Sequence, residues 1–162
     1  MRALLASAML LMLAACGLQP MYAGGGSGEV ARGLAAIEVP AIEGRAGWLV
    51  RNALTDRLGA AGEANPRYRL DVRLDDRLEG LGVLSDDTIG RERRMLRARY
   101  QLVDTASDEI LLDATAGADA GIDVVSSEYA VIAAEQTALE NLSEEVADRI
   151  VTQLALTLRQ QR

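Results

Sequence analysis

The residue types in this chain leave little ordinary enzyme chemistry open and draw attention to one cysteine. Among its 162 residues there is a single cysteine, Cys16, and no histidine. Without histidine the chain has no imidazole for a catalytic triad, for a metal site or for a pH switch near neutrality. The covalent chemistry to explain is therefore that of Cys16.

A second candidate for chemistry is a concentration of arginine in residues 88–103. This segment holds five arginines against one acid, whereas residues 104–162 hold twelve acids and three arginines. Arginine suits phosphate recognition because its planar guanidinium group bonds oxygens in pairs and stays charged. The five residues are Arg91, Arg93, Arg94, Arg97 and Arg99.

The same arginines could instead form ion pairs with a neighbouring strand. All of them except Arg94 occupy odd-numbered positions, so they project from one face of a strand. The acids available on the preceding strand are Asp71, Asp75 and Glu79. We expect Arg97 and Arg99 to pair with them. Fewer acids are available to Arg91, Arg93 and Arg94 near the start of the segment, so these three remain the better candidates for phosphate recognition.

Paired acids are the remaining candidates for metal binding or acid–base chemistry. Adjacent residues on a strand point to opposite faces, so Asp75 and Asp76 are not expected to converge. Asp86 and Asp87 lie in a turn-like stretch, where aspartate is common. Neither pair has the spacing of a calcium loop. We therefore predict no enzyme activity, no metal site and no cofactor.

Two short elements are predicted before the arginine-rich segment. Residues 34–39 resemble a short strand. Apolar residues recur at helical spacing over residues 50–61, and Gly59 or Gly62 can end this helix. Trp48, the only tryptophan, is expected to be an anchor at the helix entrance, either in the core or against a partner.

Three segments alternate with a period of two and predict a meander of antiparallel strands. They cover residues 68–79, 88–103 and 109–116. In the first of them apolar residues fall on one face and charged residues on the other, with Asp76 as the single exception. This pattern is typical of a sheet that is buried on one side and solvated on the other.

One long amphipathic helix is predicted after these strands. Neither glycine nor proline follows Gly121; Ser126 or Ser127 can cap the start of the helix, and Ser143 could begin a second one. The order is then strand, helix, three strands, helix (βαβββα). It predicts an α/β (α+β) two-layer sandwich, with two helices on one face of a mainly antiparallel four-stranded sheet.

The N-terminal residues predict a lipid anchor. Met1 and Arg2 precede a short apolar run that ends in Leu13-Ala14-Ala15-Cys16. A positive start, a short apolar stretch and small residues are typical of a secretory signal, and the run is too short to span a membrane. Its end closely resembles the bacterial lipobox, which implies cleavage before Cys16 and acyl chains on that residue.

This reading divides the chain into three parts. Residues 1–15 are a lipoprotein signal peptide, and residues 16–33 are a lipidated cysteine and a flexible linker that contains a glycine-rich stretch. Residues 34–162 form one α/β domain. Gly17 follows the cysteine where lipoproteins retained in the inner membrane commonly carry aspartate, so the outer membrane is the expected destination.

Taken together, the sequence resembles the LptE family of lipopolysaccharide-assembly lipoproteins, in an alphaproteobacterial form. The resemblance rests on Cys16-Gly17, on Arg51-Asn52-Ala53-Leu54 in a helix, on Arg99-Tyr100-Gln101-Leu102 in a strand, and on the long acidic final helix. The chain departs from the family pattern in having no lysine and many arginines.

The resemblance implies a non-enzymatic protein of the Gram-negative cell outer membrane that plugs the LptD β-barrel and assists lipopolysaccharide transport. It places the lipopolysaccharide-binding residues near the start of the Tyr-Gln strand, where Arg93 has the matching position and Arg91 and Arg94 flank it. Arg97 and Arg99 would extend this basic face. The protein is then anchored on the periplasmic side, with its domain in the barrel lumen.

Two other functions remain open at this point. The chain could be a lipoprotein scaffold of another envelope transport complex that does not bind lipopolysaccharide, or an enzyme that uses Asp75 or Asp86–Asp87. Nucleic acid is not expected as a partner, because the net charge is −7 and the sequence pI is about 4.7, whereas phosphate backbones require a basic surface.

Overall fold

The structure is a computed structural model that describes residues 28–59, 66–83 and 89–160. Within these ranges the chain forms three helices and four strands. In chain order they are α2 (Glu29–Ala35), β1 (Ile37–Glu38), α3 (Gly44–Leu58), β2 (Tyr68–Val83), β3 (Ile89–Asp104), β4 (Ile110–Asp123) and α4 (Glu128–Gln160).

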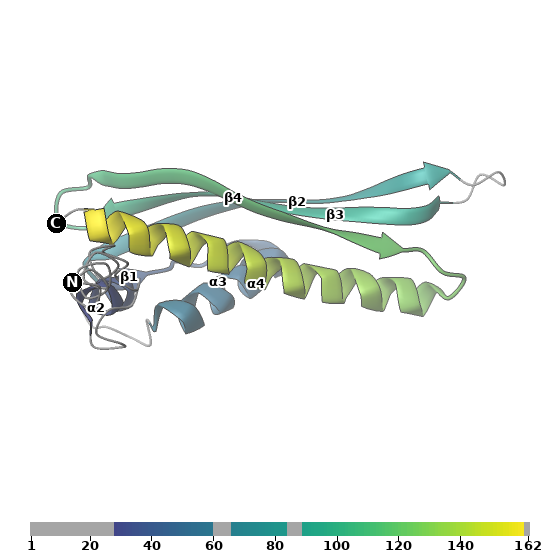
Figure 1. The fold of residues 1–162 in the computed structure, drawn as a ribbon, viewed down its shortest axis with the longest axis horizontal. Helices are drawn as coiled ribbons and strands as arrows, with labels where there is room; N and C mark the ends of the chain where they lie inside the picture. The colour runs from purple at the N-terminus through teal and green to yellow at the C-terminus, as the bar shows by residue number, and fades with distance from the viewer. Residues whose placement is uncertain (1–27, 60–65, 84–88, 161–162) are drawn as a thin grey trace, which may run out of the picture.

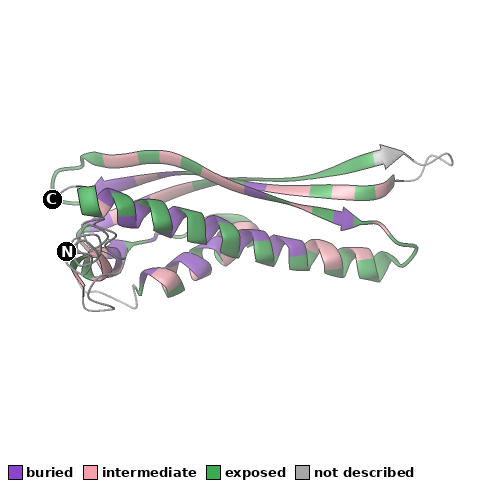
Figure 2. Cartoon of the chain, viewed as in Figure 1, coloured by how far each residue is buried: buried purple, intermediate pink, exposed green. Residues whose placement is uncertain are grey.

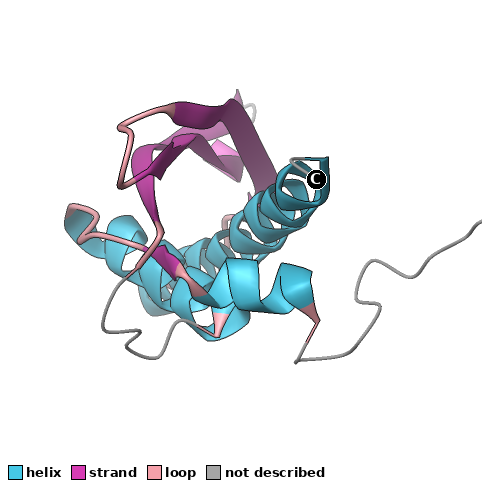
Figure 3. Cartoon of the chain, turned by 90° about the vertical axis from the view of Figure 1, so that its left-hand side faces the viewer, coloured by secondary structure: helices cyan, strands magenta, loops and turns pink. Residues whose placement is uncertain are grey.

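The elements form two layers, one of strands and one of helices (Figures 1 and 3). The strands follow the order β1-β2-β3-β4; β1 pairs with β2 in parallel, and the three long strands pair antiparallel. The helices lie against one face of this sheet, which we call the helix side; the other face is called the outer face. The predicted two-layer α+β sandwich is therefore confirmed, with one helix more than expected.

The core lies between the two layers and follows the period-two pattern of the strands. On the helix side Leu70, Leu96 and Leu102 are completely buried, and α4 contributes Ile150 and Leu154 to the same core. Burial is concentrated in the part of the molecule where α3 and α4 lie together, as Figure 2 shows. The alternation of apolar and charged residues determines which face of the sheet is buried. Removal of that apolar area from water stabilises the packing of the two layers.

The final helix is continuous over 33 residues. Its first turn begins at Ser127, whose carbonyl oxygen accepts hydrogen bonds from the N–H groups of Ala130 and Val131. Ser143, which could have begun a second helix, is buried and its hydroxyl donates to the Leu139 carbonyl at 2.7 Å. A bond to the preceding turn satisfies the hydroxyl without breaking the helix.

The N-terminal elements differ from the sequence-based predictions. Residues 29–33, predicted as linker, belong to α2, and the strand predicted over residues 34–39 is reduced to Ile37–Glu38. Helix α3 begins at Gly44 rather than near residue 50. Gly59 caps its C-terminal end, and its φ of +67° is the left-handed conformation expected there. Gly62 lies outside the described residues.

The sheet is longer than the part that α3 covers. Beyond α3, α4 is the only one of the described helices that lies under the strands (Figure 1). We call this region the distal end; it comprises residues 76–83 of β2, residues 89–96 of β3 and residues 118–135, which run from the end of β4 into α4. The predicted strand over residues 109–116 was too short, because β4 continues into this end as far as Asp123.

Close packing at Gly47 generates a prediction for stability. A Cβ atom on Gly47 would lie 2.5 Å from the Ile42 carbonyl oxygen, so the backbone would have to move. We expect Gly47→Ala to lower the free energy of unfolding by about 1–3 kcal/mol in urea denaturation. The control is Gly33→Ala, whose Cβ would meet only the flexible Leu158 side chain at 3.2 Å. Equal effects of the two substitutions would contradict this account.

Candidate functional site

The predicted arginine cluster is divided between the two faces of the sheet. Arg91, Arg93, Arg97 and Arg99 lie at outer-face positions of β3, whereas Arg94 lies on the helix side together with buried Leu96. The separation follows from the alternation of side chains along a strand. The structure therefore does not bring the three proposed lipopolysaccharide-binding arginines to one face.

Arg91 and Arg93 form exposed ion pairs with the end of β4. The guanidinium nitrogens lie 3.2 Å from Asp123 for Arg91 and 2.7 Å from Asp119 for Arg93. These side chains are between 46% and 77% exposed. Exposed pairs of this kind contribute little to stability, so both arginines can exchange a carboxylate for another anion at low cost.

Arg94 is held much more firmly, beneath the start of α4. Its guanidinium donates to both carboxylate oxygens of Asp76, at 2.9 and 2.6 Å, and to the Glu135 carbonyl at 3.0 Å. The Arg94 side chain is only 16% exposed, and the hydrogen bonds to Asp76 raise its pKa. Glu92, on the same face, has a buried Oε2 without a hydrogen-bond partner. The surroundings of Arg94 are thus already acidic.

The pairing expected for the middle of β3 is wrong, because neither Arg97 nor Arg99 binds Asp71, Asp75 or Glu79 of β2. Arg99 is paired, but with Asp113 of β4, at 2.9 Å. Hydrogen bonds from Arg99 and Gln101 hold the pKa of the Asp113 carboxyl below its usual value. The Asp113 carboxylate therefore stays charged until the pH falls through that lowered pKa. Arg97 has no carboxylate within 4.0 Å among the described residues, because Asp75 opposite it is bound by Arg77.

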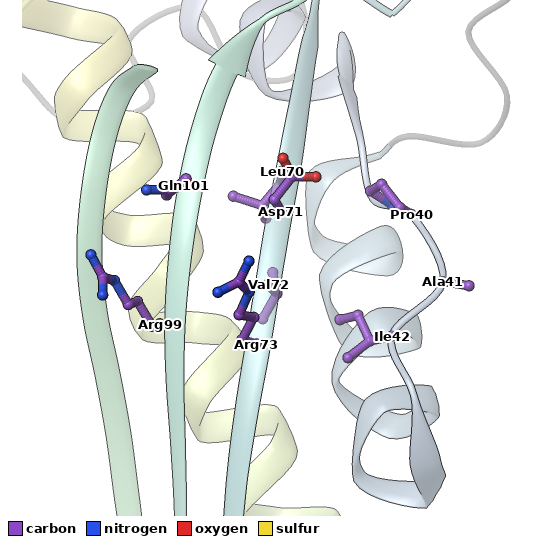
Figure 4. A pocket seen from close by; sticks show the side chains of 9 residues that line it. All are labelled: Pro40, Ala41, Ile42, Leu70, Asp71, Val72, Arg73, Arg99 and Gln101. Carbon is purple, nitrogen blue, oxygen red and sulfur yellow. The ribbon is translucent and has the colours of Figure 1, made fainter.

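A cleft adjoins this middle part of the outer face. It has a volume of about 460 Å³ and lies between residues 40–42 and the neighbouring strands, with Arg73, Arg99 and Gln101 among its lining (Figure 4). Helix α3 positions the wall of this cleft, because Arg51 Nε donates to the Val39 carbonyl at 3.0 Å. Sequence reasoning missed Arg73, which alternates with Asp71 and Asp75 on the charged face of β2 and carries no distinguishing signal.

Strand β4 is an edge strand, and one helix side chain covers part of its edge. Arg149 of α4 donates a hydrogen bond to the Gly117 carbonyl and another to Glu145. Edge carbonyls are otherwise open to pairing with another strand. The link also joins the two layers at the middle of β4.

The other candidates for chemistry stay apart or lie outside the described residues. Asp75 faces outward and Asp76 faces the helices, as predicted, and no described group of three acidic or cysteine side chains could hold a metal ion. Trp48 is 62% exposed on α3, so the core alternative is wrong. Cys16 and the Asp86–Asp87 pair lie outside the described ranges. None of the described helices has the length and apolar character that a membrane span requires.

Comparison with protein families decides the relationship. The model of the LptE family, described as lipopolysaccharide-assembly, matches residues 34–154. The chain belongs to the LptE family. This match covers every element from β1 through most of α4, and therefore both arginine-bearing faces of the sheet. It supports a role in lipopolysaccharide assembly. Comparison with curated protein sequences gives no match.

Solved structures share the fold of this LptE-family chain. A putative lipoprotein from Caulobacter crescentus CB15 is 28% identical, with a TM-score of 0.69 over 80% of this chain and 96% of that one. A minor lipoprotein from Acinetobacter baumannii is 16% identical, with a TM-score of 0.56 over 74% of this chain and 88% of that one. The rare lipoprotein B of Shewanella oneidensis is 15% identical, with a TM-score of 0.53 over 75% and 92%. The last two show the fold alone.

The different environments of the distal arginines predict different effects on stability. We expect Arg94→Ala to lower the free energy of unfolding by about 1–3 kcal/mol, because it leaves the half-buried Asp76 carboxylate without its donors. Arg91→Ala and Arg93→Ala should each cost less than about 1 kcal/mol. Urea denaturation measures all three. An Arg94 variant no less stable than the other two would show that the Asp76 pair is not structural.

Proposed function

We propose that this protein is a non-enzymatic lipoprotein of the outer membrane that acts with an LptD-like β-barrel in lipopolysaccharide transport. Membership of the LptE family supports the assembly role. The charged outer face suits the polar lumen of a large barrel, and the related Caulobacter structure is described as that of a putative lipoprotein.

The observation that carries lipopolysaccharide binding is the composition of the distal end. Arg91 and Arg93 lie there in exposed ion pairs, and the exposed side chain of Leu81 lies directly opposite Arg91 on the same face. Further exposed apolar side chains of the distal end are Leu78 on the helix side of β2, Val125 before α4, and Tyr129 and Ile132 at the start of α4. A surface with phosphate-binding guanidinium groups beside apolar area matches a phosphorylated lipid.

Within this site Arg91 and Arg93 have the binding role, and Arg94 has a supporting one. A phosphate group that approached Arg94 would have to displace Asp76 and would meet Glu92 on the same face. Arg91 and Arg93 face solvent and require no such displacement of a half-buried group. Arg94 instead fixes β2 and β3 to the start of α4.

The lipopolysaccharide proposal is tested by substitution of the two exposed arginines. We expect the double variant Arg91→Ala/Arg93→Ala of the full chain, in non-ionic detergent, to bind fluorescent lipopolysaccharide roughly tenfold more weakly. The loss should be larger at low salt, where charges are screened least. Arg45→Ala, which removes an exposed ion pair between α3 and Glu140 of α4, is the control. Unchanged affinity in a folded double variant would sink the assignment.

The anchor and the partner are tested together on protein isolated from outer membranes. Mass spectrometry should show a chain that begins at Cys16 and carries acyl chains, and more than one chain is needed for lasting attachment. A Cys16→Ser variant should lack the acyl chains and retain residues 1–15. The wild-type protein should co-purify with a large β-barrel. Capture of other envelope proteins without a barrel would favour the scaffold alternative.

A further inference from the structure

We infer that Arg73, Arg97 and Arg99 form a second anion site, at the middle of the outer face, that binds a phosphate monoester group. This outer-face site goes beyond the proposed function. It uses different residues, and it lies on the part of β2 and β3 that the cleft adjoins rather than at the distal end.

The strand register places three arginine residues next to one another on the outer face. Arg73 of β2 is directly opposite Arg99 of β3, and Arg97 is two residues from Arg99 on the same strand, so it is the diagonal neighbour of Arg73. Directly opposed residues have Cβ atoms about 4.5–5.5 Å apart, and diagonal ones lie within reach of long side chains. Like charges in these positions destabilise a sheet unless an anion lies between them.

The acids of the outer face do not supply that anion. Asp71 is bound by Arg69 at 3.1 Å, Asp75 by Arg77 at 2.9 Å, and Asp113 by Arg99 at 2.9 Å. Each of these three acids therefore has an arginine of its own. In the described part of the chain Arg73 and Arg97 have no carboxylate within 4.0 Å, and two positive charges are left without compensation.

The position opposite Arg97 on β4 explains why this arginine is left over. Arg93 and Arg99 bind aspartates that lie diagonal to them on β4, Asp119 and Asp113. Arg97 lies opposite Gly117, and its diagonal neighbours on β4 are Thr115 and Asp119, which Arg93 already binds. The stem of Arg97 occupies the space that this glycine leaves, since a Cβ on Gly117 would lie 3.2 Å from Arg97 Cγ. The Arg97 side chain thus lies along the sheet, and its guanidinium group has no carboxylate partner among the described residues.

The cleft gives a bound molecule room beside the charges. In Figure 4 Arg73, Arg99 and Gln101 appear as neighbouring side chains on two strands, with Pro40 and Ile42 on the opposite wall. A phosphate monoester carries close to two negative charges at pH 7, which matches the two uncompensated guanidinium groups. Guanidinium binds phosphate oxygens in pairs, and the apolar wall can contact the group that carries the phosphate.

The test measures binding of two phosphate compounds to the full chain in non-ionic detergent by calorimetry. The probes are inorganic phosphate and dihexanoyl phosphatidic acid, which distinguish free phosphate from a lipid headgroup. We expect Arg73→Gln and Arg97→Gln each to weaken binding about tenfold, and the double variant to abolish it, with the melting temperature unchanged or raised because like charges are removed. Arg69→Gln, on the same face but paired with Asp71, is the control and should bind as the wild type does.

Each outcome decides the proposal. Binding of both probes that is lost in the Arg73 and Arg97 variants supports a site for the phosphate group itself. Binding of phosphatidic acid alone, lost in the same variants, supports a lipid headgroup as the source, and binding of inorganic phosphate alone supports a soluble one. Absence of binding, or equal weakening by Arg69→Gln, overturns the site. The distal variant Arg91→Ala/Arg93→Ala should leave this binding unchanged.

Discussion

Burial of one face of the sheet against α4 is the interaction on which the rest of the molecule depends. The helix runs for 33 residues under three strands, and apolar side chains on the helix side meet it along most of that length. Removal of this apolar area from water is the main favourable contribution to folding. Because the apolar side chains of the strands point to the helix side, the other face carries the charged ones.

That division lets charged groups serve in two different ways. On the outer face ion pairs are exposed, weak and exchangeable, as for Arg91 with Asp123. On the helix side the same residue type, Arg94, is enclosed and bound to both Asp76 and the backbone of α4. A shift of one residue along a strand therefore separates an arginine that can bind a ligand from one that holds two layers together.

Much of the fold could be predicted because the sequence is periodic where the elements are long. Alternation identified β2 and β3, and the absence of glycine and proline identified α4. Alternation failed where small residues dominate: residues 117–121 have weak strand preference, yet pairing with β3 extends β4 through them. The start of α3 was missed because Gly44 and Gly47 disfavour a helix in isolation. In the fold, Ile42 packs so closely on residue 47 that a glycine is needed there.

The ion pairs could be predicted less well than the strands, because the number and positions of charged residues in the sequence do not determine which acid an arginine binds. Asp75 lies opposite Arg97 but is taken by Arg77 of its own strand, and only the side-chain arrangement shows it.

The bond from Arg149 to the Gly117 carbonyl has a consequence for self-association. A long edge strand rich in alanine and glycine is a template on which identical chains can stack into sheets. The helix side chain interrupts that template at its middle, so a newly made copy has no uninterrupted ladder to extend. A second copy that added to this edge would first have to displace Arg149 from the Gly117 carbonyl.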